Sequence, residues 1–207
     1  MMATRFDSWR AAFLAGGALI IVGGWNHPRG AMVDMLAHHD WLWSHVLFTL
    51  GVVALLAGLV AFRRTAVMGP SLSRWTRYAI WLTALQTFEA VMHTVAMVDA
   101  ANLAAGRSTP VLMAHLWLAI AIYPIFGAAI IGFIVAAMRE RAAGSPWIGW
   151  LGILGAAAHG LSAPLTLILE IPWAPILFPM VMLLALWMVL VAVWPARSAA
   201  VNAAPAL

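Results

Sequence analysis

The sequence predicts an all-α polytopic membrane protein with six transmembrane helices. Of its 207 residues, 65% are hydrophobic and 9% are charged, whereas a soluble domain is about 45–50% apolar and about 25% charged. Apolar stretches long enough to cross a bilayer, about 20 residues each, recur along the chain, and none alternates like a barrel strand. We therefore expect a single helical membrane domain over residues 1–195 and no separate soluble domain.

The expected spans cover residues 9–25, 41–62, 75–98, 110–138, 147–169 and 172–194. Arg5 precedes the first span and Arg10 lies at its start, as in a signal peptide, but the span ends without an A-x-A site, so we interpret it as a retained anchor. Residues 196–207 are Ala-rich and are expected to form a disordered tail. Signals for helix starts precede four of the later spans, with Asp40, Ser73, Thr109 and Ser145 as caps and Pro110 and Pro146 at first helical positions.

The arginines predict the orientation. Nine of the 11 basic residues, all of them Arg, fall on one side of the predicted membrane, and only Arg29 and Arg107 fall on the other. The Arg-rich side faces the cytoplasm, so both termini are expected to be cytoplasmic. Tryptophans near the span ends form the expected aromatic belts, with Trp25, Trp41, Trp43, Trp117 and Trp173 outside and Trp9, Trp75, Trp147, Trp150 and Trp194 inside.

Composition excludes several functions. The chain has no Cys and no Lys, which excludes disulfides, iron–sulfur clusters, thioether-linked haem and Schiff-base cofactors. The isoelectric point near 11.1 reflects membrane orientation, and we expect no nucleic acid as a partner.

Five ionisable residues lie inside four successive spans: His45, Glu89, His93, His115 and His159. Such residues face the bundle or a cavity and mark functional sites. Counting 1.5 Å per residue, the imidazoles of His45, His93 and His115 lie roughly 6–8 Å below the outer boundary, with Glu89 and His159 deeper, at roughly 14–15 Å. We expect four imidazoles and one carboxylate to converge in the outer half of the membrane.

The third span carries a polar face. Gln86, Glu89 and His93 recur at three- and four-residue spacing and so line one stripe. The Glu89–His93 spacing suits a carboxylate that shares a metal with an imidazole, and equally a hydrogen-bonded pair. Tyr123 is a candidate hydrogen-bond or radical partner.

The resulting hypothesis is a site that binds haem b or a non-haem transition metal (iron, copper or zinc). A haem requires a flat slot, for which Gly51, Gly58, Gly127 and Gly132 leave room. The alternative is that each His is a hydrogen-bonded core residue.

Two further motifs contain histidine. We interpret His38-His39-Asp40 as a solvated loop and cap, or else as a place where a metal ion enters. We interpret Asn26-His27-Pro28 as the turn that ends the first span.

Three short motifs carry a resemblance: Gly23-Gly24-Trp25-Asn26-His27-Pro28, Trp41-Leu42-Trp43-Ser44-His45, and Pro146-Trp147-Ile148-Gly149-Trp150-Leu151-Gly152. Together they resemble uncharacterised six-helix membrane proteins of bacteria with GC-rich genomes, which implies the bacterial cytoplasmic (inner) membrane but no activity. One His on each of spans two to five is also loosely similar to the di-haem cytochrome b561 family. There the His pairs sit near opposite membrane faces, whereas here all share the outer half, which leaves one haem or a compact metal site.

The leading functional hypothesis is a metalloprotein that transfers electrons, for example with quinone, or oxidises a small or lipidic substrate, with Glu89 moving protons. Two other functions stay open. The chain can be an accessory subunit of a larger membrane complex, or a proton-coupled carrier that uses Glu89 and the histidines as a relay.

Overall fold

The computed structural model describes residues 7–65, 68–142 and 144–194, and every regular element in these ranges is helical. This confirms the all-α prediction. The predicted tail 196–207 lies outside the described residues. The elements in chain order are α1 (Ser8–Trp25), α2 (Met32–Ala37), α3 (Asp40–Thr65), α4 (Pro70–Val95), η1 (Ala96–Asp99), α5 (Ala100–Ala104), α6 (Pro110–Arg139), α7 (Pro146–Leu167), η2 (Ala174–Leu177), η3 (Pro179–Val181) and α8 (Met182–Val193).

Among the described residues, five segments are long and apolar enough to cross a membrane: α1, most of α3, α6, α7, and the stretch Ala174–Val193. The expected span 172–194 is not one regular helix, since η2 and η3 precede α8. Pro175 and Pro179 lie in these short segments and cannot donate a backbone N–H to a continuous helix. The expected span at 75–98 corresponds to α4, which is 26 residues long but is not among the five.

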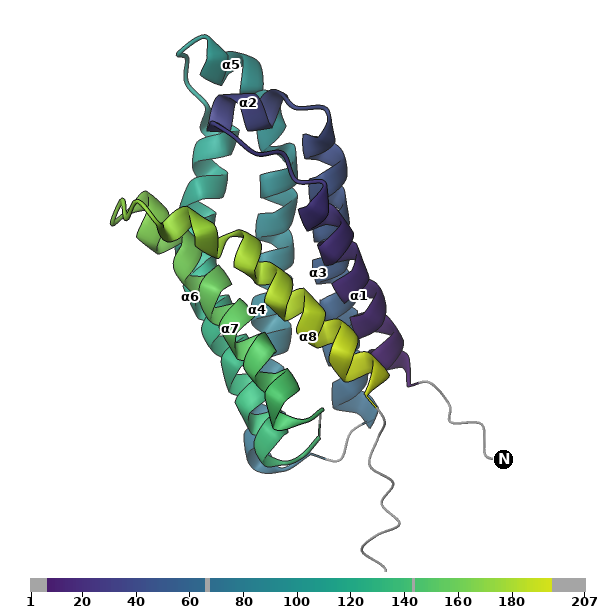
Figure 1. Cartoon of the computed structure of the whole chain (residues 1–207). Helices are drawn as coiled ribbons and strands as arrows, with labels where there is room; N and C mark the ends of the chain where they lie inside the picture. The colour runs from purple at the N-terminus through teal and green to yellow at the C-terminus, as the bar shows by residue number, and fades with distance from the viewer. Residues whose placement is uncertain (1–6, 66–67, 143, 195–207) are drawn as a thin grey trace, which may run out of the picture.

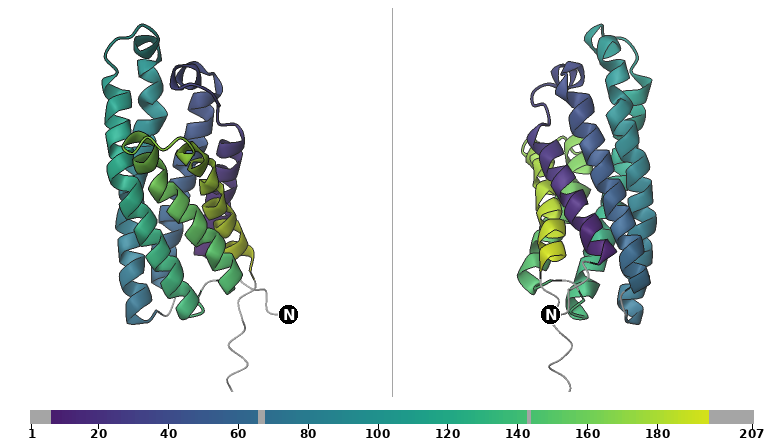
Figure 2. Two further views of the ribbon diagram at one scale, coloured as in Figure 1. Left: turned by 60° about the vertical axis from the view of Figure 1, so that its left-hand side comes forward. Right: turned by 90° about the vertical axis from the view of Figure 1, so that its right-hand side faces the viewer.

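The six long helices pack as a closed ring. Each contacts two neighbours, in the order α1, α3, α4, α6, α7, α8 and back to α1. Helices α2 and α5 lie at one end of the ring, which we call the cap end. Helix α1 begins and α8 finishes at the opposite end, which we call the terminal end (Figure 1). The connection from α7 to η2 turns back before it reaches the cap end (Figure 2), so α3, α4 and α6 extend further there.

The terminal half has a core of aromatic rings. Phe13 of α1 packs edge-on to Trp9 at 5.7 Å between centroids and contacts Trp187 of α8 at 5.6 Å. Phe62 packs edge-on to Trp9 at 5.3 Å and to Phe133 at 5.5 Å. Trp9 is thus a core residue and not part of an aromatic belt, because it is 6% exposed and packs against rings of α1 and α3.

Two carboxylates from neighbouring segments cap the starts of α4 and α6. Asp99 accepts the backbone N–H groups of Val111 and Leu112 at 2.7 and 2.9 Å. At the terminal end, Glu140 accepts the N–H groups of Gly69 and Leu72 at 2.7 and 3.2 Å. These acids satisfy N–H groups that a helix leaves unpaired at its start.

The capping predictions were therefore partly wrong. Pro110 and Pro146 occupy first helical positions as predicted, but in this part of the chain the side chains of Thr109 and Ser145 make no capping hydrogen bond. Ser73 lies inside α4, which begins three residues earlier at Pro70. A carboxylate can cap a helix from a distant segment, and local spacing does not reveal this.

Candidate metal centre

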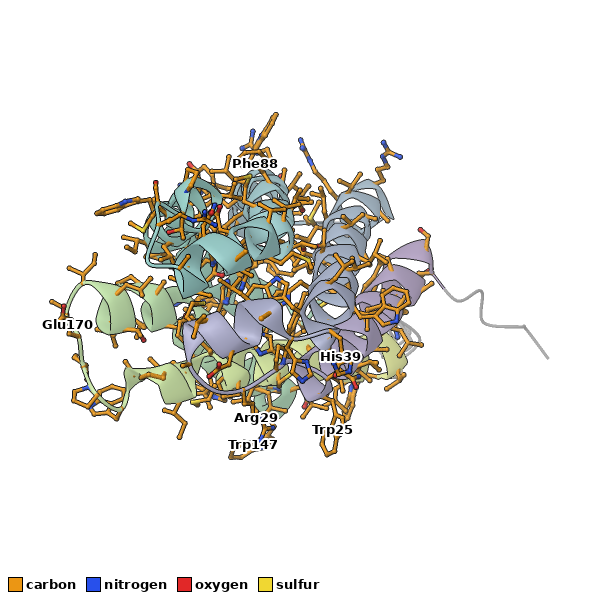
Figure 3. The ribbon with its side chains drawn as sticks, turned by 90° about the horizontal axis from the view of Figure 1, so that it is seen from above. Trp25, Arg29, His39, Phe88, Trp147 and Glu170 are labelled. Atoms are coloured by element: carbon orange, nitrogen blue, oxygen red, sulfur yellow. The ribbon has the colours of Figure 1, made fainter. Side chains whose placement is uncertain are left out.

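The polar stripe of α4 faces the interior of the ring, as the spacing predicted. Gln86 and Glu89 are buried, and the Gln86 amide donates to Glu89 Oε2 at 2.7 Å. His93, one turn further toward the cap end, is partly buried. The opposite face of α4 is apolar, and Phe88, 56% exposed, points away from the bundle (Figure 3). The stripe thus carries its polar groups toward α3, α6 and α7.

Four imidazoles form a continuous row near the cap end. The ring centroids of His27 and His45 are 4.8 Å apart, those of His45 and His93 are 4.3 Å apart, and those of His93 and His115 are 4.0 Å apart. The rings come from the α1–α2 connection, α3, α4 and α6, in that order. Helices that are distant in sequence therefore bring their histidines into direct contact, which is the convergence expected for His45, His93 and His115.

Backbone carbonyls hold two of these rings in one tautomer. His45 Nδ1 lies 2.6 Å from the carbonyl oxygen of Trp41, and His27 Nδ1 lies 2.6 Å from that of Pro28. A carbonyl only accepts, so each Nδ1 carries the proton, and each Nε2 presents a lone pair. Metal-binding histidines are oriented in this way, with one nitrogen bound to a carbonyl and the other to the ion. Burial also lowers the pKa of His27 below its usual value, which favours the neutral ring.

His45 Nε2 is a buried nitrogen without a hydrogen-bond partner among the described residues. Such a group is rare in folded proteins because its desolvation is uncompensated. One ligand atom each from His27, His45 and His93 lies within 4.8 Å of the others. An ion bound at about 2.1 Å from each nitrogen needs separations of about 3.4 Å in a tetrahedral site, so small movements of the side chains suffice.

Glu89 forms a second set of contacts beneath the row. Its Oε1 lies 2.8 Å from His115 Nδ1, but the two atoms do not form a hydrogen bond. Tyr123 donates its hydroxyl to the same oxygen at 3.2 Å, which confirms Tyr123 as a hydrogen-bond partner. Glu89, His93 and His115 also offer ligand atoms within 4.8 Å of one another.

His159 lies apart from both groups. Its Nε2 is 3.4 Å from Gln86 Oε1, and its ring lies over that of Tyr123 at 4.0 Å between centroids. It contacts the partners of Glu89 and belongs to neither set of three ligand atoms within the described ranges. Of the five predicted ligands, the structure brings together His45, Glu89, His93 and His115 and leaves His159 one residue further away.

Two residues of the centre were misassigned from the sequence. The Asn26-His27-Pro28 segment does end α1, but it also delivers His27 to His45. Trp41 was placed in the outer aromatic belt, yet it is 2% exposed, and its ring stacks on His45 at 4.0 Å. Its indole N–H donates to the Thr94 carbonyl at 3.3 Å. The four-residue spacing of Trp41 and His45 on one helix was the available signal for this stacking.

A third set of possible ligands, His38, His39 and Asp40, lies where α3 begins. The two imidazoles stack at 4.4 Å, and His39 Nε2 is 3.3 Å from Asp40 Oδ1. All three side chains are substantially exposed, with His39 at 83%. This arrangement agrees with a solvated loop, and water competes with any ion there.

The arrangement does not fit a haem b. Neighbouring rings of the row are separated by 4.0 to 4.8 Å between centroids, which leaves no gap for a flat macrocycle between any two successive histidines. The space beside the four glycines that were expected to open a slot is instead filled by atoms of neighbouring helices. Gly51, Gly58, Gly127 and Gly132 lie against Ile20, Phe13, Ala156 and Trp75, respectively.

Comparisons of the whole chain with protein-family models, with curated proteins and with solved structures find no match.

Proposed function

We propose that the chain is an integral membrane protein that crosses the bilayer six times, and that α4 is a span in addition to the five apolar segments. The mean hydropathy of α4 is low because of residues that face the ring interior, such as Gln86 and Glu89. The face of α4 away from the ring exposes Trp81, Leu85 and Phe88, at spacings of three and four residues. A helix with an apolar outer face and buried polar groups is stable in lipid when its polar residues have partners inside the bundle.

The proposed orientation places the terminal end in the cytoplasm. Arg63 and Arg64 lie in the last turn of α3 and Arg139 in the last turn of α6. Arg74 and Arg77 lie in the first turns of α4. All these ends belong to the terminal end of the ring (Figure 1), and an excess of Arg marks the cytoplasmic side. In this orientation the row of histidines lies near the external surface of the membrane, which we propose is the bacterial inner membrane.

The function that the geometry supports best is binding of a non-haem transition-metal ion at His27, His45 and His93. The observation that carries this proposal is the buried Nε2 of His45, which has no hydrogen-bond partner in the described chain while the Trp41 carbonyl holds Nδ1. Neutral imidazole suits iron, copper and zinc. Partial exposure of His27 and His93 gives an ion access to the site.

The ion serves electron transfer or oxidation of a small or lipidic substrate at the outer surface, with quinone as one candidate partner. His27 follows Trp25 by two residues, and Trp25 is 83% exposed, as expected for a side chain at the membrane interface. Solutes from water and lipid headgroups both reach this depth. With one ion bound at His27, His45 and His93, Glu89, which Gln86 and Tyr123 orient, is the acid–base group beside it.

Metal analysis of protein purified in detergent tests this proposal. Wild-type protein loaded with Cu²⁺ or Zn²⁺ and then gel-filtered should retain at least one ion per chain, and His45→Ala should retain less. His39→Ala is the matched control, because it removes an exposed imidazole near the same end. Wild-type protein that retains no ion, or a His45→Ala variant that is folded by circular dichroism and retains as much as wild type, would contradict the proposal.

A further inference from the structure

The row of histidines contains more ligands than one ion can reach. His93 belongs to two sets of possible ligands, one with His27 and His45 and the other with Glu89 and His115. Within the described residues, His27 and His115 share no such set, because three successive ring contacts separate them. An ion with bonds of about 2.1 Å to nitrogen cannot bind both ends of the row.

The second set has its own indication of a ligand. His115 is buried, and its Nδ1 has no hydrogen-bond partner in the part of the chain that the structure describes. Glu89 Oε1 lies 2.8 Å from this nitrogen without forming a hydrogen bond, so the two ligand atoms face each other directly. Since a buried ring nitrogen without a partner is costly, both His45 in the first set and His115 in the second carry a nitrogen that a bound ion would satisfy.

Glu89 is held as a ligand would be. Gln86 donates to Oε2 at 2.7 Å and Tyr123 donates to Oε1 at 3.2 Å. A carboxylate has about four lone-pair positions, so these two bonds fix its orientation and leave acceptor capacity on each oxygen. Hydrogen-bonded carboxylates of this kind are typical of metal sites, in which a second layer of residues orients the ligand.

We propose that the centre holds two transition-metal ions and that the imidazole of His93 bridges them. His27 and His45 complete the site of one ion, and Glu89 and His115 complete the site of the other. An imidazole has two ring nitrogens, so one ring can bind both ions. When the second ion binds, the remaining N–H proton of His93 leaves to water. This inference rests on the proposed function, because it assigns a second ion to the same centre.

The closing experiment measures copper per chain in Cu²⁺-loaded protein after gel filtration. Wild type and His39→Ala should retain two ions. Glu89→Gln and His115→Asn, which alter only the second set, should each retain one ion. His27→Ala, which alters only the first set, should also retain one ion. Circular dichroism establishes that each variant is folded. Because two variants of the second set are tested, the test stays valid if one of these variants fails to fold.

Electron paramagnetic resonance of the same samples tests the bridge. Two copper ions joined by one imidazole couple magnetically, so the signal per copper in wild type should be well below that of an isolated ion. The one-copper variants, Glu89→Gln and His27→Ala, should give the full signal per copper.

The outcomes separate the two proposals. Wild-type protein that binds no ion overturns the proposed function and this inference together. One ion in wild type, lost in His45→Ala, leaves the proposed function standing and overturns the second ion. Two ions that show the full signal per copper overturn the bridge, and a count that falls in His39→Ala as much as in His27→Ala assigns the copper to the exposed loop and overturns the inference.

Discussion

The two halves of the bundle are built from different chemistry. The terminal half contains interlocking rings such as Phe13, Phe62 and Trp187 and close helix contacts at glycine. The cap half contains a row of imidazoles and a buried carboxylate that several helices share. In water-free surroundings, apolar packing specifies which helices meet, whereas buried polar groups are costly unless partners or ligands satisfy them. The aromatic packing of the terminal half stabilises the fold, and the contrast supports the proposal that the metal centre lies in the cap half.

The largest expected effect on stability comes from the terminal half. Phe13 is 1% exposed and fills the space that Gly58 leaves open. Phe13→Ala should lower the free energy of unfolding by about 3–5 kcal/mol, as for other buried aromatic residues, and leave the metal content of folded protein unchanged. Equilibrium unfolding in mixed detergent micelles measures this. Phe88→Ala, at an exposed position on the outer face of α4, is the control and should change stability far less. Equal losses would contradict the division into two halves.

A smaller loss is expected from the polar network of the cap half. Tyr123→Phe removes the hydroxyl that donates to Glu89 Oε1, and a hydrogen bond to a charged group contributes about 1.5–3 kcal/mol. The variant should unfold more easily by an amount in this range and should retain bound metal, because Tyr123 orients Glu89 without being a ligand. The unfolding assay and metal analysis check the two parts. Complete loss of metal in folded Tyr123→Phe would place the hydroxyl itself at the ion.

The two carboxylate caps give a direct comparison between the ends. Asp99→Ala at the cap end and Glu140→Ala at the terminal end each leave two backbone N–H groups without their carboxylate partner. Each should cost about 1 kcal/mol in the free energy of unfolding. Hydrogen exchange should increase in the first turn of α6 for the former and of α4 for the latter. A change in the opposite helix would show that the caps act through the bundle and not locally.

The smallest expected effect concerns the closure of the ring. Arg10 of α1 donates to the carbonyl oxygens of Ala192 and Trp194 at 3.2 and 2.5 Å, at the end of α8. A cation at a helix C-terminus contributes about 0.3–1 kcal/mol. Arg10→Gln should therefore lower stability slightly, measured by the same unfolding assay, with faster exchange in the last turn of α8. No change in α8 would indicate that apolar contacts alone close the ring.

The helical class and the polar interior face of α4 were both predictable from the amino-acid sequence. Both follow from local properties, because apolar length and three- and four-residue spacing depend only on nearby residues. The sequence also predicted that His45, His93 and His115 meet, since their distances from the helix ends place them at one depth. The depth of a residue along a helix follows from the number of residues that separate it from the helix end.

The tertiary structure sets the direction in which each side chain points at that depth. It placed the Trp41 ring against His45 instead of in the aromatic belt, and it brought His27 from a connecting segment into the row. It left His159 behind Gln86 and Tyr123, and it filled the expected haem slot with side chains from neighbouring helices. These outcomes depend on the order of helices around the ring and on their rotation. Contacts between distant residues set both, and no local pattern in the chain encodes them.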